Sequence, residues 1–347
     1  MTDLDTLNLK AFEIMHEKSD LYKSSQFWEE ACKKINFEIS NGKIDHFRKL
    51  ETSLNFFVPT YGTPGNSFSD ENISNILNLF ELNSKLYNSQ KNFLSGHSQF
   101  MSDYRVLSAF DYSNSAFDLL NFSESNYGFP KEHFVQGGKF YSRSSLNYLL
   151  GMSFLIKNLP DFRPNVVLEI GGGFGTLGEI FNKTYSNDFK YIDIDLPPIF
   201  SIAYNYIKEA CELKDSEIHI SNLSDKELIS IKDLPKFSFL PTWEIEKLKG
   251  KIDLFVNFIS FQEMEPDIVE NYLKIVSSLD SEVILLRNMR EGKQKAAKGS
   301  VGVLDPVIGD DFMNLLNNYK LIDTNVHPYG YATVDGFHSE LYLFVKR

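Results

Sequence analysis

Cysteine and long apolar runs are both scarce in this sequence. The 347 residues include two cysteines, Cys32 and Cys211, far apart and without the spacing of metal ligands. This excludes a disulfide framework and a structural zinc site. No run of about 18 apolar residues occurs, and the N-terminus lacks a basic segment followed by an apolar core. We therefore expect a cytoplasmic protein without stable membrane insertion.

Positive charge is also in deficit. The sequence has 35 Lys and Arg against 47 Asp and Glu, a net charge of -12. Such a surface repels phosphate backbones and anionic lipid headgroups, so we expect no nucleic-acid partner. The hydrophobic content of 42% is ordinary for a globular protein. The length exceeds one domain of about 100–200 residues and indicates two units.

The first unit is expected to be a mostly helical cap, residues 1–140. Apolar residues between Phe27 and Phe37 recur at helical spacing, and a second such run covers 73–86. The stretch 59–66 between them is rich in turn-forming residues. No internal repeat or low-complexity tract interrupts this region.

The second unit, residues 141–347, alternates strands with helices, which predicts a Rossmann-like α/β fold with helices on both faces of a parallel sheet. The last two strands are joined by a segment too short for a crossover helix, so the final strand should run antiparallel. The expected sheet has seven strands, at 166–170, 190–194, 218–220, 253–257, 282–286, 320–326 and 341–346.

A glycine-rich loop follows the first of these strands. Gly171, Gly173 and Gly175 recur at every second position after Glu169, where the strand gives way to a helix. Glycine lets the backbone turn sharply and approach a ligand, and the helix N-terminus offers N–H groups to an anionic group. Asp195 ends the next strand, 20 residues past Gly175, where a ribose would need an acceptor.

Two cofactors fit this loop. Gly173, Gly175 and Gly178 also satisfy the dinucleotide fingerprint. The carboxylate of Glu169 would repel a pyrophosphate but attract the ammonium group of S-adenosylmethionine, the cofactor we predict. The alternatives are a nicotinamide-dependent oxidoreductase or epimerase acting on a nucleotide sugar, and a non-catalytic partner subunit of this fold. No Tyr-x-x-x-Lys pair follows the fourth strand, as the former would require.

Three motifs carry a resemblance to a known family. VLEIGGGFGTL (167–177), DLPP (195–198) and NFISFQEM (257–264) resemble the sugar O-methyltransferases of bacterial capsule and lipopolysaccharide clusters. The resemblance covers about residues 135–347. It implies the class I methyltransferase fold and methyl transfer to a sugar hydroxyl in surface polysaccharide biosynthesis. The sugar would be free, nucleotide-linked or part of a glycan.

The same fold implies the placement of further residues. Asn222 ends the expected third strand, where an adenine would lie, and Asn257 ends the fourth, where the cofactor's methyl group would lie. Glu263, in the following turn, is the first candidate for a general base. Its alternative role is to stabilise the next helix through the helix dipole. His327 and His338, beside the last two strands, are the alternative bases.

Three residues are candidates for contact with the acceptor. Tyr141 and Arg143 precede the first helix of the second unit, and Arg287 begins the lysine-rich segment 287–305. Cations of that segment could hold the diphosphate of a nucleotide sugar, or the segment could be a solvated loop. No definite metal-ligand set is present, so no metal is predicted. The sheet edge and the helical cap both permit a homodimer.

Overall fold

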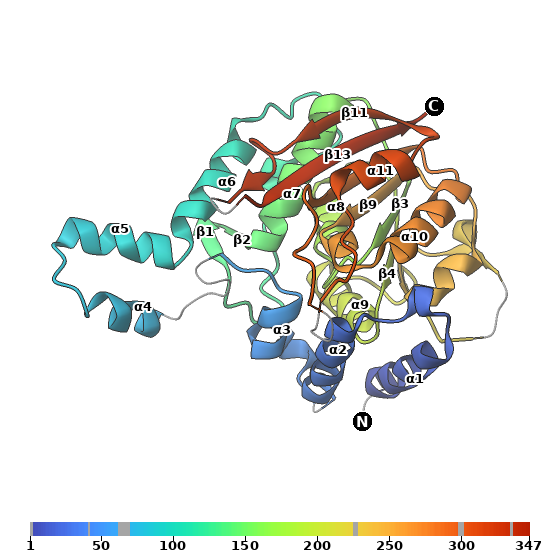
Figure 1. Ribbon diagram of the computed structural model, residues 1–347, viewed down its shortest axis with the longest axis horizontal. Coiled ribbons are helices and arrows are strands. Elements are labelled where there is room, and N and C mark those ends of the chain that lie inside the picture. Colours follow the sequence, from blue (N-terminus) through green and yellow to red (C-terminus); the bar gives the residue numbers. More distant parts are fainter. Residues whose placement is uncertain (1–2, 41, 62–69, 225–227, 298–301, 334–335) are drawn as a thin grey trace.

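A nine-stranded sheet lies at the centre of the computed structural model, which describes residues 3–40, 42–61, 70–224, 228–297, 302–333 and 336–347 (Figure 1). The strand order is β11-β13-β10-β9-β3-β4-β7-β5, and β12 pairs with β13. The strands are β3 (Val166–Ile170), β4 (Lys190–Asp195), β5 (Ile218–Ile220), β7 (Phe237–Pro241), β9 (Leu254–Phe258), β10 (Val283–Met289), β11 (Tyr319–Asn325), β12 (Tyr331–Ala332) and β13 (His338–Lys346).

The direction of the last strand decides the fold. β13 runs antiparallel to β10 on one side and to β11 on the other, whereas β10, β9, β3, β4, β7 and β5 pair in parallel. The chain has the α/β fold of class I methyltransferases. The expected architecture is confirmed: the seven predicted strands are present as β3, β4, β5, β9, β10, β11 and β13, and the sheet also contains β7 and β12.

One strand differs from the sequence analysis. The third strand of the parallel series is β7, which pairs with β4, and β5 lies outside it at the edge of the sheet. Residues 218–220 form a strand as predicted, but the strand at 237–241, which lies between them and β4, was not predicted. The β7 sequence is short, follows Pro235 and ends at Pro241, and prolines around a short apolar run usually indicate a loop.

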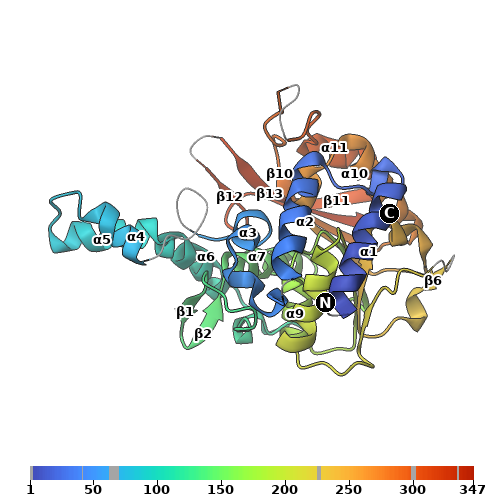
Figure 2. The ribbon, with the colours of Figure 1, turned by 90° about the horizontal axis from the view of Figure 1, so that it is seen from below.

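Helices cover both faces of the sheet (Figures 1 and 2). One face carries α7, α8 and α9, and the other carries α10 and α11. α7 is buried along most of its length because it packs between the sheet and α6. Its N-terminus is capped by Ser142 in a reciprocal bond with Ser145. The helices are α7 (Arg143–Asn158), α8 (Thr176–Thr184), α9 (Ile199–Ala210), α10 (Pro266–Ser278) and α11 (Gly309–Leu315).

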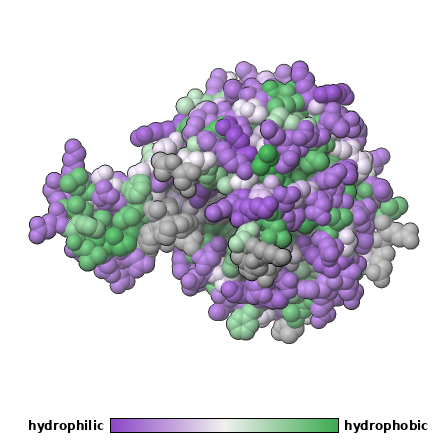
Figure 3. Space-filling view, viewed as in Figure 1, coloured by the Kyte–Doolittle hydropathy of each residue, from purple (hydrophilic) through white to green (hydrophobic). Residues whose placement is uncertain are grey.

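The N-terminal region is mostly helical. α1, α2 and α3 lie beside α9 and α10, and α4 and α5 form an arm that protrudes from the body (Figures 1 and 2). Apolar side chains gather on this arm (Figure 3), among them the exposed Leu79, Phe80, Leu86 and Phe93. The helices are α1 (Asp3–Glu17), α2 (Gln26–Ile39), α3 (Glu51–Phe56), α4 (Asp70–Leu77), α5 (Ser84–Leu94) and α6 (His97–Ala109).

Shorter elements connect these regions. β1 (Phe134–Gln136) and β2 (Lys139–Tyr141) form a hairpin before α7, and β6 (Ile229–Ser230) pairs with β8 (Leu248–Lys249). No helix among the described residues is both long and apolar enough to span a bilayer.

A buried ion cluster ties the N-terminal region to the glycine loop. Arg48 donates to Glu132 at 2.7 Å and to Glu124 at 2.7 Å, and all three side chains are fully buried. The guanidinium also lies 4.8 Å from the centre of the Phe174 ring, which belongs to the loop. Glu124 also accepts hydrogen bonds from the backbone N and the Oγ of Ser142, the N-cap of α7, so the cluster links the cap to the α/β unit.

Candidate functional site

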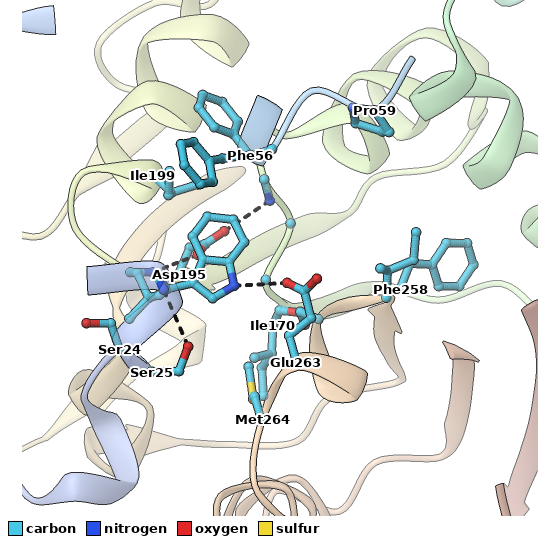
Figure 4. A pocket seen from close by; sticks show the side chains of 18 of the residues that line it. Ser24, Ser25, Phe56, Pro59, Ile170, Asp195, Ile199, Phe258, Glu263 and Met264 are labelled. Carbon is cyan, nitrogen blue, oxygen red and sulfur yellow. Dashed lines mark hydrogen bonds between the residues drawn. The ribbon is translucent and has the colours of Figure 1, made fainter. Parts of the chain in front are cut away.

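A cavity of about 610 Å³ opens at the carboxyl ends of the central strands (Figure 4). Its floor comes from the glycine loop, the end of β4, the turn after β9 and the first turns of α7. Its opposite wall comes from the cap, through residues 23–28 and 54–60. The cap therefore contributes to the site as well as covering the sheet.

The glycine loop needs its glycines for two different reasons. Gly171 and Gly173 have φ values of 75° and 63°, in the left-handed region that disfavours side chains. A Cβ atom at Gly171 would also lie 2.3 Å from Ser260 Oγ. At Gly173 a Cβ atom would meet no atom closer than 3.8 Å. Gly175 does not line the cavity; it is the N-cap of α8, also at positive φ.

Asp195 lies at the carboxyl end of β4 and lines the cavity. Its Oδ2 accepts a hydrogen bond from Gly173 N at 3.0 Å, and its Oδ1 accepts one from Leu196 N at 2.7 Å. Burial raises its pKa to about 7. The residue that the sequence singled out for ribose binding thus also fixes the glycine loop.

Two more carboxylates lie behind the loop. Glu169 is fully buried, accepts a hydrogen bond from the Tyr148 hydroxyl at 2.6 Å and one from Tyr191, and burial raises its pKa to about 7. Asp193 is also fully buried, and burial raises its pKa well above the usual range. Its Oδ1 accepts from Gly172 N at 3.2 Å, and within the described chain its Oδ2 has no hydrogen-bond partner.

These three carboxylates have no counter-ion in the described part of the chain: no Lys, Arg or His nitrogen lies within 4.0 Å of Glu169, Asp193 or Asp195. Buried charge of one sign is costly unless a partner compensates it. Burial raises the pKa of all three groups, so they take up protons readily in the free protein, and a positively charged ligand in the cavity would favour their ionised form.

Glu263 lies at the centre of the cavity, in the turn after β9. Trp28 Nε1 donates a hydrogen bond to Glu263 Oε2 at 2.9 Å (Figure 4), and Lys293 Nζ donates to Oε1 at 2.8 Å. In Figure 4, Asp195 and Phe258 lie on opposite sides of Glu263. The candidate base is thus oriented by a tryptophan of the cap and by a lysine of the segment after β10.

Asn257 supports this turn from below and does not line the cavity. It is fully buried, and its Nδ2 donates to the Ile170 carbonyl at 3.0 Å and to Ser260 Oγ at 2.5 Å. Its Oδ1 accepts from Phe261 N at 3.2 Å. Asn257 therefore joins the end of β3 to the turn that carries Glu263.

Four candidates lie away from the cavity. Asn222 is exposed beyond the edge strand β5, which the unpredicted β7 separates from β4, and its Oδ1 accepts a hydrogen bond from Ser224 N. Tyr141 packs among aromatic rings of α6. His327 is exposed, and His338 bonds Glu291 at 2.5 Å. None of the four lines the cavity.

The remaining two acceptor candidates lie next to each other. Arg143 lines the cavity, and Arg287 is buried behind it, donating to the Asn147 carbonyl at 2.8 Å. In the lysine-rich segment, Arg290 instead forms a two-bond ion pair with Glu340. Lys298 lies outside the described residues.

Several wall residues were not found by sequence reasoning. Trp28 of α2, Thr242 after β7 and Phe57 all line the cavity. Their positions depend on how the cap packs against the sheet, and no local pattern carries that information. Among the described residues, no three His, Cys, Asp or Glu side chains are grouped so as to hold a metal ion.

No protein-family model and no curated protein matches the chain. Three solved structures illustrate the similarities found. Magnesium protoporphyrin IX methyltransferase from Synechocystis PCC 6803 with bound SAH aligns over 59% of this chain and 85% of its own, with 11% identity and a TM-score of 0.40.

An S-adenosylmethionine-dependent methyltransferase from Clostridium acetobutylicum ATCC 824 aligns over 57% of this chain and 92% of its own, with 15% identity and a TM-score of 0.39. The mitomycin 7-O-methyltransferase aligns over 100% of this chain and 76% of its own, with 10% identity and a TM-score of 0.36.

Proposed function

We propose that this chain is an S-adenosylmethionine-dependent O-methyltransferase that acts on a sugar hydroxyl. The observation that carries the proposal is the set of three buried carboxylates without a counter-ion, Glu169, Asp193 and Asp195, behind a glycine loop that lines a cavity. S-adenosylmethionine carries a sulfonium and an ammonium against one carboxylate. Its net positive charge would favour the ionised form of these carboxyl groups and supply the missing counter-charge.

The residues present fit the cofactor. Asp195 would accept hydrogen bonds from the ribose hydroxyls. The backbone of the glycine loop would lie close to the methionine half, since no Cβ atoms stand between them. A volume of about 610 Å³ lies within the range of about 300–1,000 Å³ usual for ligand sites. When bound, the cofactor supplies a methyl group on positively charged sulfur, which an oxygen nucleophile can attack.

The nicotinamide alternative fits this floor poorly. A dinucleotide brings two negatively charged phosphates to the loop, where three carboxylates lie buried. Negative phosphates near these groups would raise their pKa values further, whereas a positively charged ligand would lower them. The same charge set therefore favours one cofactor and disfavours the other.

Glu263 is the base in this proposal. Of the three candidates, Glu263, His327 and His338, it is the one that lines the cavity. Trp28 and Lys293 each bond one of its oxygens, and a carboxylate oxygen has a second lone pair for a substrate hydroxyl. General-base assistance is typically worth about 10²–10⁴-fold in rate. The sugar as acceptor rests on the resemblance of residues 257–264.

Calorimetric titration with S-adenosylmethionine, S-adenosylhomocysteine, NAD and NADP tests the cofactor. We expect the first two to bind, and Asp195→Ala to weaken them, while Asp188→Ala, an exposed aspartate before the same strand, leaves them unchanged. Binding of NAD or NADP instead would overturn the proposal. Mass spectrometry of sugars incubated with the enzyme and cofactor then tests methyl transfer, with Glu263→Gln as the inactive control.

A further inference from the structure

Two arginines at one end of the cavity form no ion pair with any carboxylate of the described residues. Arg143, the first residue of α7, lines the cavity, and Arg287, on β10, is 1% exposed. Within the described chain, no carboxylate oxygen lies within 4.0 Å of either guanidinium. Because a buried or half-buried charge without a counter-ion is unfavourable, the pair needs an explanation.

Neutral groups hold both guanidiniums in place. Arg143 donates to the Thr60 carbonyl at 3.0 Å and to the Tyr331 hydroxyl at 2.9 Å. Arg287 donates to the Asn147 carbonyl at 2.8 Å and to Ser339 Oγ at 3.0 Å. These bonds fix the direction of two positive charges without neutralising them.

The two charges share one aromatic ring. The guanidinium carbons of Arg143 and Arg287 lie 5.5 and 5.6 Å from the centre of the Tyr331 ring. The carboxylate that interacts with both is Asp103 of α6, which also accepts a hydrogen bond from the Tyr61 hydroxyl. Burial raises the pKa of Asp103, whereas the two arginines lower it. One carboxylate therefore faces two arginines and offsets them in part.

The cations of the lysine-rich segment behave differently. Arg290 is paired with Glu340 and Lys293 with Glu263, each at 2.8 Å. Lys295, which is largely exposed, faces Asp305 at 4.0 Å. In a protein with 47 acidic residues, these cations have found carboxylate partners. Among the described residues Arg143, which lines the cavity, forms no such ion pair, so its end of the cavity is the better site for an anion.

We infer that the Arg143 end of the cavity binds an acidic group of the acceptor, a carboxylate or a phosphate carried by the sugar. Arg143 would contact it directly, and Arg287 would add positive charge from behind. Two of the five N–H groups of Arg143 are used in the bonds described, so a two-bond contact to an anion remains available. The identity of this ligand as the acceptor rests on the proposed function.

Calorimetric titration with glucuronate, glucose 1-phosphate and glucose, at saturating S-adenosylhomocysteine, tests the inference. We expect at least one acidic sugar to bind about tenfold or more tightly than glucose, and Arg143→Gln to remove most of that difference. Comparison of the two acidic probes distinguishes a sugar acid from a sugar phosphate. Arg105→Gln, at an exposed position on α6, should change nothing.

Two further measurements keep the test decisive. Arg143→Lys retains the charge and should keep part of the preference, and the melting temperature of each variant shows whether it has folded. Equal binding of all three sugars by the wild type would overturn the inference, as would full preference in a folded Arg143→Gln variant. If S-adenosylhomocysteine fails to bind, the proposed function fails, and the same titrations on the free protein still decide the anion site.

Discussion

Trp28 and Glu263 are separated by 235 positions in the chain, yet the indole nitrogen of one donates a hydrogen bond to the carboxylate of the other at 2.9 Å. Trp28 lies on α2 in the cap, and Glu263 ends the turn after β9. The contact joins the cap to the turn after β9, so the cap takes part in orienting the proposed base. A catalytic domain expressed without the cap would lack one side of its site.

Replacing Trp28 with Phe tests this orientation. The substitution keeps an aromatic ring but removes the hydrogen bond to Glu263. A hydrogen bond to a charged group contributes about 1.5–3 kcal/mol, so we expect kcat for methyl transfer to fall roughly tenfold or more. Affinity for S-adenosylmethionine should be unchanged. Phe37→Leu, on the exposed side of the same helix, is the matched control. A Trp28→Phe variant with full kcat would contradict the role.

The pH dependence of cofactor binding follows from the buried carboxylates. Burial raises the pKa of Asp195 and of Glu169 to about 7. A bound cation favours the ionised form of these two carboxyl groups. Affinity for S-adenosylmethionine should therefore be higher above about pH 7 than below it. S-adenosylhomocysteine lacks the sulfonium charge and should depend less on pH. Its Kd divided by that of S-adenosylmethionine should therefore be larger at about pH 8 than at about pH 6.

The free protein should show the opposite trend in stability. Between about pH 4 and 7 the folded state holds protons on Asp195 and Glu169 that the unfolded state releases. The stability these two groups contribute is therefore present at low pH and lost as the pH rises through about 7. Urea denaturation across this range, for the wild type and Asp195→Asn, isolates the contribution. An identical pH profile in the two proteins would argue against it.

Removing Arg48 should destabilise the whole molecule. Arg48→Met leaves Glu124 and Glu132 buried without their partner, which typically costs about 3–5 kcal/mol. We expect a matching drop in the free energy of unfolding in urea. Arg105→Met makes the same arginine-to-methionine change at an exposed position and should change stability by less than about 0.5 kcal/mol. A small effect at Arg48 would mean that the two glutamates find other partners or take up protons.

Alanine substitutions at two glycines distinguish the effect of backbone strain from the effect of a steric clash within the glycine loop. Gly171 and Gly137 both have positive φ, so alanine is strained at either position by about 1–2 kcal/mol. A Cβ atom at Gly171 would lie 2.3 Å from Ser260 Oγ, whereas none of the described atoms lies within 4 Å of one at Gly137. Gly171→Ala should therefore weaken S-adenosylmethionine binding by at least about tenfold, and Gly137→Ala should not. Calorimetry on both variants checks this.

The sequence predicted those parts of the site that are contiguous in the chain. Gly171, Gly173 and Asp195 follow directly from strands whose apolar runs are unambiguous, so their placement at one edge of the sheet was predictable. Glu263 follows the fourth strand in the same way. In each case the strand, the turn and the functional residue form one local segment.

The rest depends on contacts between distant segments. The strand at 237–241 was not predicted, because prolines flank its short apolar run and pairing with β4 stabilises it. Asn222 follows β5, which lies outside this strand at the sheet edge, so it lies away from the cavity. Trp28 is indistinguishable in the sequence from an ordinary core residue of an amphipathic helix. Arg287 resembled the start of a solvated basic loop, but it lies within β10 and is buried.

The cavity changes sign along its length. Within the described residues, the carboxyl groups behind the Asp195 side have no counter-ion, and the two guanidiniums at the Arg143 end are offset only in part by Asp103. Such a separation is a fixed dipole built into the walls, and it acts on a ligand before any close contact forms. A cationic cofactor at the Asp195 side and an anionic acceptor at the Arg143 end are both attracted to their places as they enter. The reversed arrangement would bring like charges together at both ends.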